Sequence, residues 1–585
     1  MTRAPGTMPP AVVPSTRYMA LLVAAFLTLG YLGIAGRLIY LQVFAHKRLA
    51  QKAERQQLEV VDLPPRRGAI YDRNGRELAV SIEAKSLYAI PARAENPKAV
   101  AARLGPMLGI PSWTVLSKLE SGKSFVWLAR KAAPDIPQKV DADKSLKGIV
   151  GWLPDTRRYY PNKDLAGHVL GFTNTDNAGI EGLEKAYEGQ VGGVAGRVVT
   201  EKDGSGREFL PLDEGFIASQ AGSDMILTLD LKVQYMVEKE LDAIMAKYNP
   251  ASATAIVMDP KTGAILAMAN RPGFNPNNRQ DTKPDSWRNR AVTDIYEPGS
   301  TFKIVTASAA LEEGVVKPTD MIYVGDGEIT VGGRTIHDSH KESGSLSFAE
   351  VIQKSSNVGT IKTAMKLGKT RLYGYAKAFG FGARTGVDLP GEVQGSLKDS
   401  GRWSGVSLAS VAIGQEVGVT ALQMLSAVNC IANGGLYVKP YIVADMRRQD
   451  GDMAGRGPQP APRRVISGNT ASKLSRILCN VVEEGGTAVE ANIRGYQVAG
   501  KTGTSQKYDR AIGKYSKEKY VSSFVGYVPA DDPKISVIVV VNEPKGQYYG
   551  GLVAAPAFKD IAEQTLMYMN VPTRLPKQTV LVERH

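Results

Sequence analysis

Three short motifs, far apart along the chain, constrain its fold most strongly. They are Ser300-Thr301-Phe302-Lys303, Ser355-Ser356-Asn357 and Lys501-Thr502-Gly503-Thr504. In the first, the serine and the lysine are three residues apart and share one face of a helix. A serine hydroxyl is a good nucleophile only when a base takes its proton, and a lysine amine can be that base. The motifs therefore predict a fold that brings three distant segments together around an activated serine.

Order and setting matter, because each pattern recurs elsewhere in the chain. The repeats are Lys261–Gly263, Ser467–Asn469 and Ser516–Lys519. Lys261–Gly263 lies between two apolar runs, which predicts a hairpin turn. Ser467 precedes apolar residues at helical spacing, which is typical of a helix cap. Ser516–Lys519 lies in a lysine-rich stretch that favours a solvated loop.

The setting of Ser300 favours catalysis. Pro298-Gly299 places it at a helix start, where free N–H groups and the positive end of the helix dipole stabilise developing negative charge. Burial beside a second cation, Lys501 on a neighbouring strand, would let Lys303 lose its proton near neutral pH. The alternatives are that Ser300 is only a helix N-cap and that Lys501 is an ordinary strand-edge lysine.

The other motif residues offer polar groups to a substrate. Ser355 can relay a proton and Asn357 can hydrogen-bond a substrate amide; alternatively, they form a polar turn between two helices. Thr502 and Thr504 provide hydroxyls, and Gly503 lets a substrate backbone approach the strand edge. A substrate peptide could then add to the sheet as an extra strand.

Charge and composition bear on the partners. The 585 residues include 72 Lys+Arg and 58 Asp+Glu, a net charge of +14. This balance suits phosphate-bearing partners, but the positive charge is scattered and neither a zinc-finger spacing nor a P-loop is found. We therefore expect no nucleic-acid partner and a surface that faces a membrane or a lipid-linked substrate. The histidines lack metal-site spacing, and the apolar helical settings of Cys430 and Cys479 favour two buried thiols over a disulfide.

A candidate membrane anchor lies near the N-terminus. Tyr18–Gly36 has no charged residue, and as a helix it would be ~28 Å long, about one bilayer core. The apolar region of a cleaved signal peptide has only about 7–15 residues. Because Leu38–Phe44 continues the run past Arg37, we favour an uncleaved anchor. Arg3 and Arg17 precede it with no acidic residue, which favours a cytoplasmic N-terminus, but Lys47 and Arg48 follow it, so charge alone does not decide the orientation.

The rest of the chain predicts two further parts and an α+β fold. Residues 46–58 indicate a polar helix, and Asn74-Gly75 predicts a turn between two strands. From about residue 224, a helix over Leu231–Tyr248 and a hairpin at 254–270 are followed by helices to about residue 490. Strands follow at Tyr496–Thr504, Tyr520–Val528 and Ile535–Val541. Two strand groups flanking a helical middle fit one antiparallel sheet. The expected boundaries are 1–17 (cytoplasmic tail), 18–44 (anchor), 45–222 (N-terminal pedestal domain), 223–573 (catalytic domain) and 574–585 (C-terminal tail).

With these motifs the chain resembles the class B penicillin-binding proteins, the monofunctional transpeptidases of peptidoglycan synthesis. The similarity runs from the anchor to about residue 570 and is closest to the division-specific (septal) members. Ser356 stands where class A β-lactamases carry aspartate, and no E-x-x-L-N follows Asn357, so the water-activating glutamate of those enzymes is not indicated. Further motifs carry the resemblance: Arg67–Gly75, Gly179–Glu184 with Tyr187, Asn289–Val292, Thr385–Glu392, Gly414–Glu416, Gly485–Thr487 and Tyr548–Gly551.

The resemblance implies the fold and the reaction. The fold would be a single transmembrane helix, an elongated mixed α/β pedestal (dimerisation-like) domain, and a transpeptidase domain with a five-stranded antiparallel sheet flanked by helices. Ser300 would attack the D-Ala–D-Ala bond of a stem peptide, and a neighbouring stem peptide's amine would resolve the acyl-enzyme. The implied roles are Lys303 as general base, Ser355 and Lys501 in proton relay, Asn357, Thr502, Gly503 and Thr504 in substrate binding, and the backbone N–H groups of Ser300 and Thr504 as the oxyanion hole.

The resemblance also implies partners and location. Peptidoglycan stem peptides would be substrates and β-lactams would acylate Ser300, with no metal or organic cofactor. A polytopic membrane glycosyltransferase and other division proteins would be partners of a single-pass protein of the cytoplasmic membrane, with its catalytic domain outside the cytoplasm. Four alternatives stay open at this point: an elongation-specific transpeptidase, a β-lactamase, a D,D-carboxypeptidase, and a non-catalytic scaffold or β-lactam sensor.

Overall fold

The computed structural model describes residues 16–123, 125–202, 208–211, 217–280, 282–339, 343–448, 451, 459–509 and 513–573. By its internal contacts the chain divides into two units. The first comprises residues 1–64 and 195–220, and the second comprises residues 65–194 and 221–585. Most of both predicted tails lies outside the described residues.

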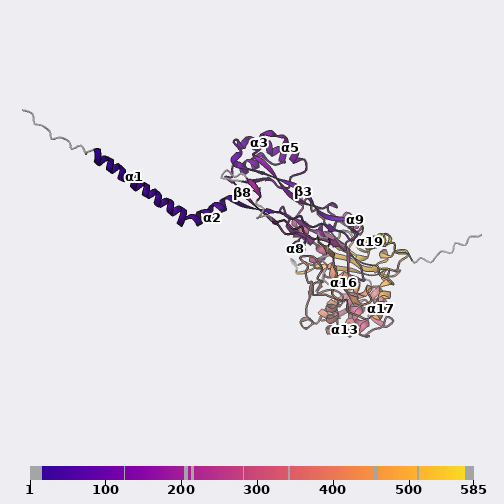
Figure 1. Ribbon diagram of the computed structural model, residues 1–585. Helices are drawn as coiled ribbons and strands as arrows, with labels where there is room; N and C mark the ends of the chain where they lie inside the picture. The colour runs from indigo at the N-terminus through magenta and orange to yellow at the C-terminus, as the bar shows by residue number, and fades with distance from the viewer. Residues whose placement is uncertain are drawn as a thin grey trace, which may run out of the picture. The chain divides into compact units, whose positions relative to one another are not determined.

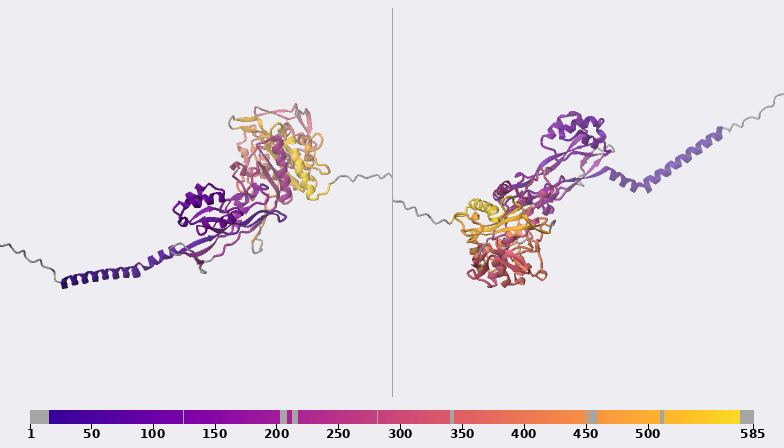
Figure 2. Two further views of the ribbon diagram at one scale, coloured as in Figure 1. Left: turned by 90° about the horizontal axis from the view of Figure 1, so that it is seen from above. Right: turned by 180° about the vertical axis from the view of Figure 1, so that it is seen from behind.

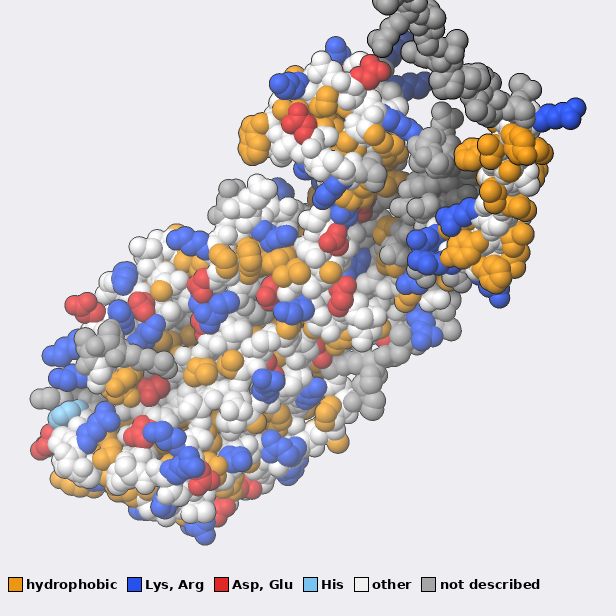
Figure 3. Space-filling model, turned by 90° about the vertical axis from the view of Figure 1, so that its left-hand side faces the viewer, with side chains coloured by type: hydrophobic (Ala, Val, Ile, Leu, Met, Phe, Trp, Pro, Cys, Tyr) orange, Lys and Arg blue, Asp and Glu red, His pale blue; other side chains and the backbone are white. Residues whose placement is uncertain are grey.

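The first unit contains the apolar helix and a small sheet. Helix α1 (Thr16–Ile39) continues through the π-helical segment η1 (Tyr40–Phe44), as the sequence predicts. Together Arg17–Phe44 is 28 residues with mean hydropathy 2.0, which is long and apolar enough to cross a membrane. Hydrophobic side chains cover most of its visible face (Figure 3). The polar helix α2 (His46–Gln57) follows, and the sheet joins β1 (Leu58–Leu63), β8 (Gly196–Lys202) and β9 (Glu208–Pro211) in that order.

The N-terminal part of the second unit is a mixed sheet with a helical cap. The predicted turn is present, with Gly75 in left-handed backbone (φ +79°) between β2 and β3. Helices α3 (Pro97–Leu108), α4 (Ser112–Leu119) and α5 (Ile136–Ala142) pack around a separate apolar core that includes Leu104 and Val115. The sheet contains β2 (Ile70–Tyr71), β3 (Glu77–Ala89), β4 (Val126–Ala129), β5 (Val150–Tyr159), β10 (Asp224–Leu227) and β20 (Val443–Arg447).

A buried ion cluster explains two of the N-terminal motifs. Glu184 is fully buried and accepts hydrogen bonds from Arg67 Nε (2.5 Å) and Arg158 Nε (2.6 Å). A Cβ on Gly68 would lie 2.0 Å from the Ser223 carbonyl oxygen, so only glycine allows this approach. Because a buried charge must be paired to be tolerated, these residues fasten distant segments of the second unit together.

The C-terminal part of the second unit is built on a five-stranded antiparallel sheet, as predicted. Its order is β12-β11-β24-β23-β22. The pairing of β11 with β24 joins the two strand groups that flank the helical middle. Helices α9 (Leu231–Tyr248) and α19 (Ala555–Tyr568) cover one face and α16 (Ala421–Ala432) the other (Figures 1 and 2). The strands are β11 (Ser252–Met258), β12 (Ile265–Arg271), β22 (Ala499–Asp509), β23 (Lys514–Val528) and β24 (Ile535–Asn542).

One local prediction is wrong. Ser516–Lys519, expected in a loop, belongs to β23, because β22 and β23 continue as a two-stranded extension in which Tyr515 pairs with Tyr508. The polar side chains there match a solvated strand as well as a loop.

The helical middle is as expected. It contains α10 (Arg290–Thr293), η6 (Gly299–Phe302), α11 (Lys303–Glu312), α12 (Phe348–Gln353), α13 (Asn357–Leu367), α14 (Lys369–Ala378), α15 (Ser407–Ala412), α16 and α17 (Gly468–Cys479), with hairpin strands β13 (Met321–Gly325), β14 (Glu328–Val331), β15 (Arg334–His337) and β16 (Gly344–Ser347).

Both cysteines are free thiols, as the sequence favours. Cys430 is buried on α16, whereas Cys479 at the end of α17 is only partly buried. Burial raises the pKa of Cys430 to about 12 and that of Cys479 to about 11. Both therefore stay protonated and unreactive at neutral pH.

Candidate active site

Ser300 lies in a tight turn that opens into a cavity. Residues Gly299–Phe302 form the 3-10 turn η6, and α11 begins at Lys303. Gly299 has left-handed backbone (φ +55°), and its N–H donates to the Gly414 carbonyl (3.1 Å). A Cβ on Gly414 would lie 2.1 Å from the Gly299 carbonyl oxygen, so glycine is required at this contact. Ser300 borders a cavity of about 730 Å³.

Lys303 is buried one turn beyond Ser300. Its side chain is 0 % exposed. The amine donates to the Ser355 carbonyl oxygen (2.5 Å) and lies 3.3 Å from Ser355 Oγ. Burial lowers the pKa of Lys303 to about 7, and the Asp338 carboxylate opposes this shift. An amine with this pKa is about half neutral at pH 7 and can accept a proton.

Lys501 approaches the same place from β22, and it is also fully buried. Its amine lies 3.4 Å from Thr502 Oγ1. Burial holds the pKa of Lys501 well below its usual value, and the neighbouring Lys303 lowers it further. Repulsion between the two ammonium groups is mutual, so the approach of Lys501 is consistent with the predicted second cation beside Lys303. Burial is the largest cause of the low pKa of both lysines.

Two neighbouring motifs hold the threonines of β22. Thr502 Oγ1 lies 2.9 Å from Thr487 Oγ1, in the Gly485–Thr487 motif. The N–H of Gly550, in the Tyr548–Gly551 motif, donates to Thr504 Oγ1 (3.0 Å). All of Thr487, Thr502, Thr504 and Gly550 line the cavity that Ser300 borders. These contacts fix both hydroxyls at the cavity wall.

Gly503 has a packing role that the sequence does not reveal. A Cβ at this position would lie 2.5 Å from Ser523 Oγ, and 2.9 Å from both the Pro298 carbonyl oxygen and Thr301 Cγ2. Contacts below 3 Å are not tolerated without movement. Gly503 therefore lets β22 pack against the turn that carries Ser300, and the approach of a substrate backbone at this position stays a prediction.

The second motif connects two helices, as the polar-turn alternative states, yet it also faces the cavity. Ser355 has left-handed backbone (φ +61°), uncommon for a residue with a side chain. Ser356 is the N-cap of α13 and accepts from the Gly359 N–H (3.0 Å). Asn357 Nδ2 donates to the His337 carbonyl (2.7 Å). Ser355 and Asn357 both line the cavity.

The recurring patterns lie elsewhere, as expected. Lys261 is in the turn between β11 and β12, with its side chain 65 % exposed and paired with Asp532. Ser467 caps α17 by accepting from the Thr470 N–H (3.2 Å). Neither lines the cavity beside Ser300. The fold thus separates the three assembled motifs from their repeats.

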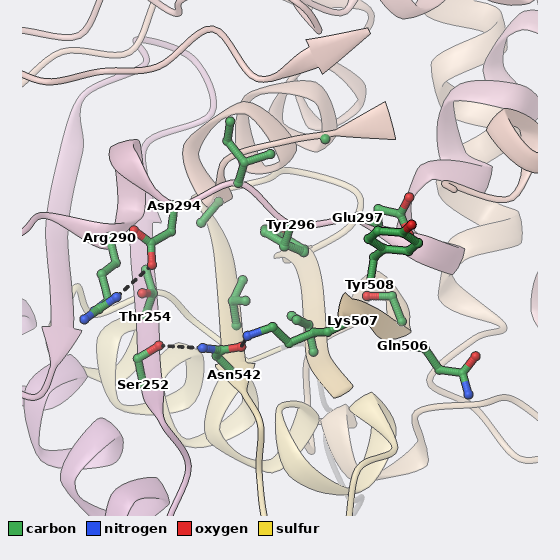
Figure 4. A pocket seen from close by; sticks show the side chains of 16 residues that line it. Ser252, Thr254, Arg290, Asp294, Tyr296, Glu297, Gln506, Lys507, Tyr508 and Asn542 are labelled. Atoms are coloured by element: carbon green, nitrogen blue, oxygen red, sulfur yellow. Dashed lines mark hydrogen bonds and ion pairs between the residues drawn. The ribbon is translucent and has the colours of Figure 1, made fainter. Parts of the chain in front are cut away.

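A second cavity, of about 420 Å³, lies next to the first and shares Ser505 and Gln506 with it. Figure 4 shows that its polar side chains already bind one another: Arg290 pairs with Asp294, and Asn542 bonds to both Ser252 and Lys507. Within the described residues, no group of three or more His, Cys, Asp or Glu side chains is placed to hold a metal ion.

Sequence reasoning missed Asp338, which follows β15. Its carboxylate accepts hydrogen bonds from Ser356 Oγ and from the N–H groups of Asn357 and Val358. No local pattern could reveal this role, because Asp338 is far from the helix start that it contacts.

Comparison with known proteins gives the same picture. The model of the penicillin binding protein transpeptidase domain matches residues 253–563, and that of the penicillin-binding protein dimerisation domain matches residues 62–227. Peptidoglycan D,D-transpeptidase FtsI of Escherichia coli is 33% identical over 95% of this chain and 92% of its own length. Stage V sporulation protein D of Bacillus subtilis is 36% identical over 96% and 87%. Penicillin binding protein 3 of Mycobacterium tuberculosis, solved with aztreonam, superposes with a TM-score of 0.69 and 30% identity, covering 88% of this chain and 99% of that one.

The chain therefore belongs to the penicillin-binding protein transpeptidase family. The dimerisation domain that precedes the transpeptidase domain, together with full-length relatives of the same design, makes it a class B member, a serine-type peptidoglycan D,D-transpeptidase. Its N-terminal apolar helix fits a single-pass membrane anchor.

Proposed function

We propose that this chain crosslinks stem peptides with Ser300 as the nucleophile and Lys303 as its general base. The observation that carries this proposal is the Lys303 amine, which is buried, has a pKa of about 7, and lies beside Ser355 one turn from Ser300. A base is most effective when its pKa is near the working pH.

In the first half-reaction, the Ser300 Oγ attacks the carbonyl carbon of the D-Ala–D-Ala bond and gives its proton to Lys303. The N–H groups of Ser300 and Thr504 stabilise the oxyanion. The proton then passes through Ser355, with Lys501 supporting the relay, to the leaving nitrogen, and the terminal D-alanine departs. The amine of a second stem peptide then attacks the ester carbonyl and gives a proton to the neutral Lys303. The acyl–Oγ bond breaks, and Lys303 returns this proton to Ser300 Oγ, which leaves the amide crosslink and the free enzyme.

Substrate binding is assigned to the cavity beside Ser300. Asn357 presents its side-chain amide there, and Thr502 and Thr504 present hydroxyls held by Thr487 and Gly550. The cavity volume of about 730 Å³ is within the range that accommodates small ligands. β-Lactams would enter the same cavity and acylate Ser300, as the aztreonam complex of the mycobacterial relative suggests.

The location follows from the anchor. Arg17 at its start supports an N-terminus in the cytoplasm and a catalytic domain outside it. The resemblance to the division-specific members supports a septal role over the elongation-specific alternative. A polytopic glycosyltransferase and other division proteins are the proposed partners. On the face shown in Figure 3, basic and acidic side chains of the second unit are interspersed, in keeping with no nucleic-acid partner.

Persistence of a penicillin adduct tests this function. The detergent-solubilised full chain is incubated with a penicillin, and its intact mass is followed over time. We expect a single adduct, located on the peptide that contains Ser300, which persists because no E-x-x-L-N motif with its water-activating glutamate follows Asn357. An adduct that disappears while penicillin is consumed would identify a β-lactamase. Folded protein that forms no adduct would favour the alternative of a non-catalytic scaffold.

Substitution of Gly503 by alanine tests the packing of the site. The new Cβ would lie 2.9 Å from the Pro298 carbonyl oxygen, so β22 and the Ser300 turn must separate. Because displacements of about 1 Å can cost ~10²-fold in rate, we expect a comparable fall in the penicillin acylation rate. The matched control is Gly405→Ala, whose Cβ would meet nothing within 4 Å. Equal rates for the two variants would refute the packing role of Gly503.

A further inference from the structure

Asp338 holds the N-terminus of α13 from outside the helix. Its Oδ2 accepts from Ser356 Oγ (2.8 Å), and its Oδ1 accepts from the N–H groups of Asn357 and Val358, the latter at 3.0 Å. The first N–H groups of a helix have no partner within it and carry the positive end of its dipole, so a carboxylate there is well placed. Asp338 is itself fixed, because its N–H donates to the Gly327 carbonyl (2.8 Å).

The segment held in this way contains two residues of the proposed site. Ser355, which precedes the cap, has left-handed backbone that its surroundings must maintain. Its carbonyl oxygen receives the Lys303 amine at 2.5 Å. Asn357, which follows the cap, donates to the carbonyl of His337, the residue before Asp338. The end of β15 thus fixes this turn through both Asp338 and His337.

The carboxylate also acts on Lys303 by its charge. It favours the protonated amine and so raises the pKa of Lys303, against the larger effect of burial. Among the described residues, Lys501 on β22 is a second charged group that interacts with Lys303. His337 lies next to Asp338 in the chain, but its ring faces Glu328 (Nδ1–Oε2 3.5 Å) rather than the site.

We propose that Asp338 is a positioning residue for acylation: it holds the Ser355–Ser356–Asn357 turn so that Ser355 meets the Lys303 amine. The inference rests on the proposed roles of Ser300 and Lys303, and it adds a residue outside the three motifs.

The test uses Asp338→Asn and Asp338→Glu in the full chain in detergent. The acylation rate by a fluorescent penicillin, per active site titrated, is measured from pH 5.5 to 9. Asparagine removes the negative charge and one hydrogen-bond acceptor. We therefore expect an acylation rate about 10²-fold lower. The inflection of the rate–pH curve should move to lower pH, because the carboxylate no longer raises the pKa of Lys303. Glutamate keeps the charge, but its longer side chain places the carboxylate differently. We therefore expect a lower acylation rate, with the inflection of the rate–pH curve at the same pH as in the parent. The matched control is Asp326→Asn in the nearby exposed turn, which should behave as the parent.

Each outcome separates the inference from the proposed function. A loss of stability in Asp338→Asn, with unchanged rate per active site and unchanged inflection, would mean a purely structural cap and would overturn the inference. Parent-like behaviour of Asp338→Asn would overturn it as well. Labelling that survives in Ser300→Ala would instead overturn the proposed function on which the inference rests.

Discussion

Replacing Ser300 by alanine will abolish covalent labelling by penicillin while leaving the fold intact. The hydroxyl is the only part of the side chain that is lost, and it makes no hydrogen bond to another described residue, so its removal leaves no described group without a partner. Without the Oγ atom no acyl-enzyme can form, whatever the neighbouring lysines do. We therefore expect no adduct by intact mass after prolonged incubation, and an unfolding midpoint equal to that of the parent.

Ser308→Ala is the matched control for this experiment. Ser308 lies on the same helix, α11, and its buried hydroxyl finds no hydrogen-bond partner among the described residues. The substitution has the same chemistry but lies away from the cavity, so labelling should proceed at the parent rate. An adduct on Ser300→Ala would place the nucleophile elsewhere, whereas loss of labelling in both variants would indicate damage to α11.

Much of the scaffold could be predicted because its signals are local. Leu231–Tyr248 shows apolar residues at helical spacing, and α9 has those bounds. The apolar runs on either side of Lys261–Gly263 form β11 and β12. In contrast, nothing local identifies Ser516–Lys519 as strand, since its conformation comes from pairing with β22 across the sheet. Tertiary contact, rather than propensity, decides such polar segments.

In the active site, too, some features could be predicted from the sequence and others depend on tertiary contacts. The order of the three motifs predicts which segments meet, and the structure brings Lys303, Ser355 and Lys501 together. The role of Gly503 could not be foreseen, because its close neighbours, Pro298 and Ser523, come from distant parts of the chain. The effect of burial on the pKa of Lys303 could be predicted, whereas the opposing effect of the Asp338 carboxylate could not.

The second large effect concerns Lys303. Since its pKa is about 7, the neutral amine makes up roughly a tenth of the population at pH 6 and nine tenths at pH 8. Only the neutral form can accept the Ser300 proton, so the acylation rate should rise about tenfold over this interval, with its midpoint near 7. A lysine of ordinary pKa would instead give a rate that still rises above pH 9. The measurement is the rate of fluorescent penicillin labelling against pH in the parent chain.

Lys303→Met should remove this dependence together with most of the rate. Methionine is close to lysine in length and suits an apolar burial site, so the helix should be kept. Loss of a general base typically costs about 10²–10⁴-fold, and we expect acylation to slow by that factor without a midpoint near pH 7. The matched control is Lys366→Met on the exposed surface of α13, which should keep both rate and profile. Fast acylation by Lys303→Met would transfer the role of base to Lys501, because it is the other buried amine in contact with the same site.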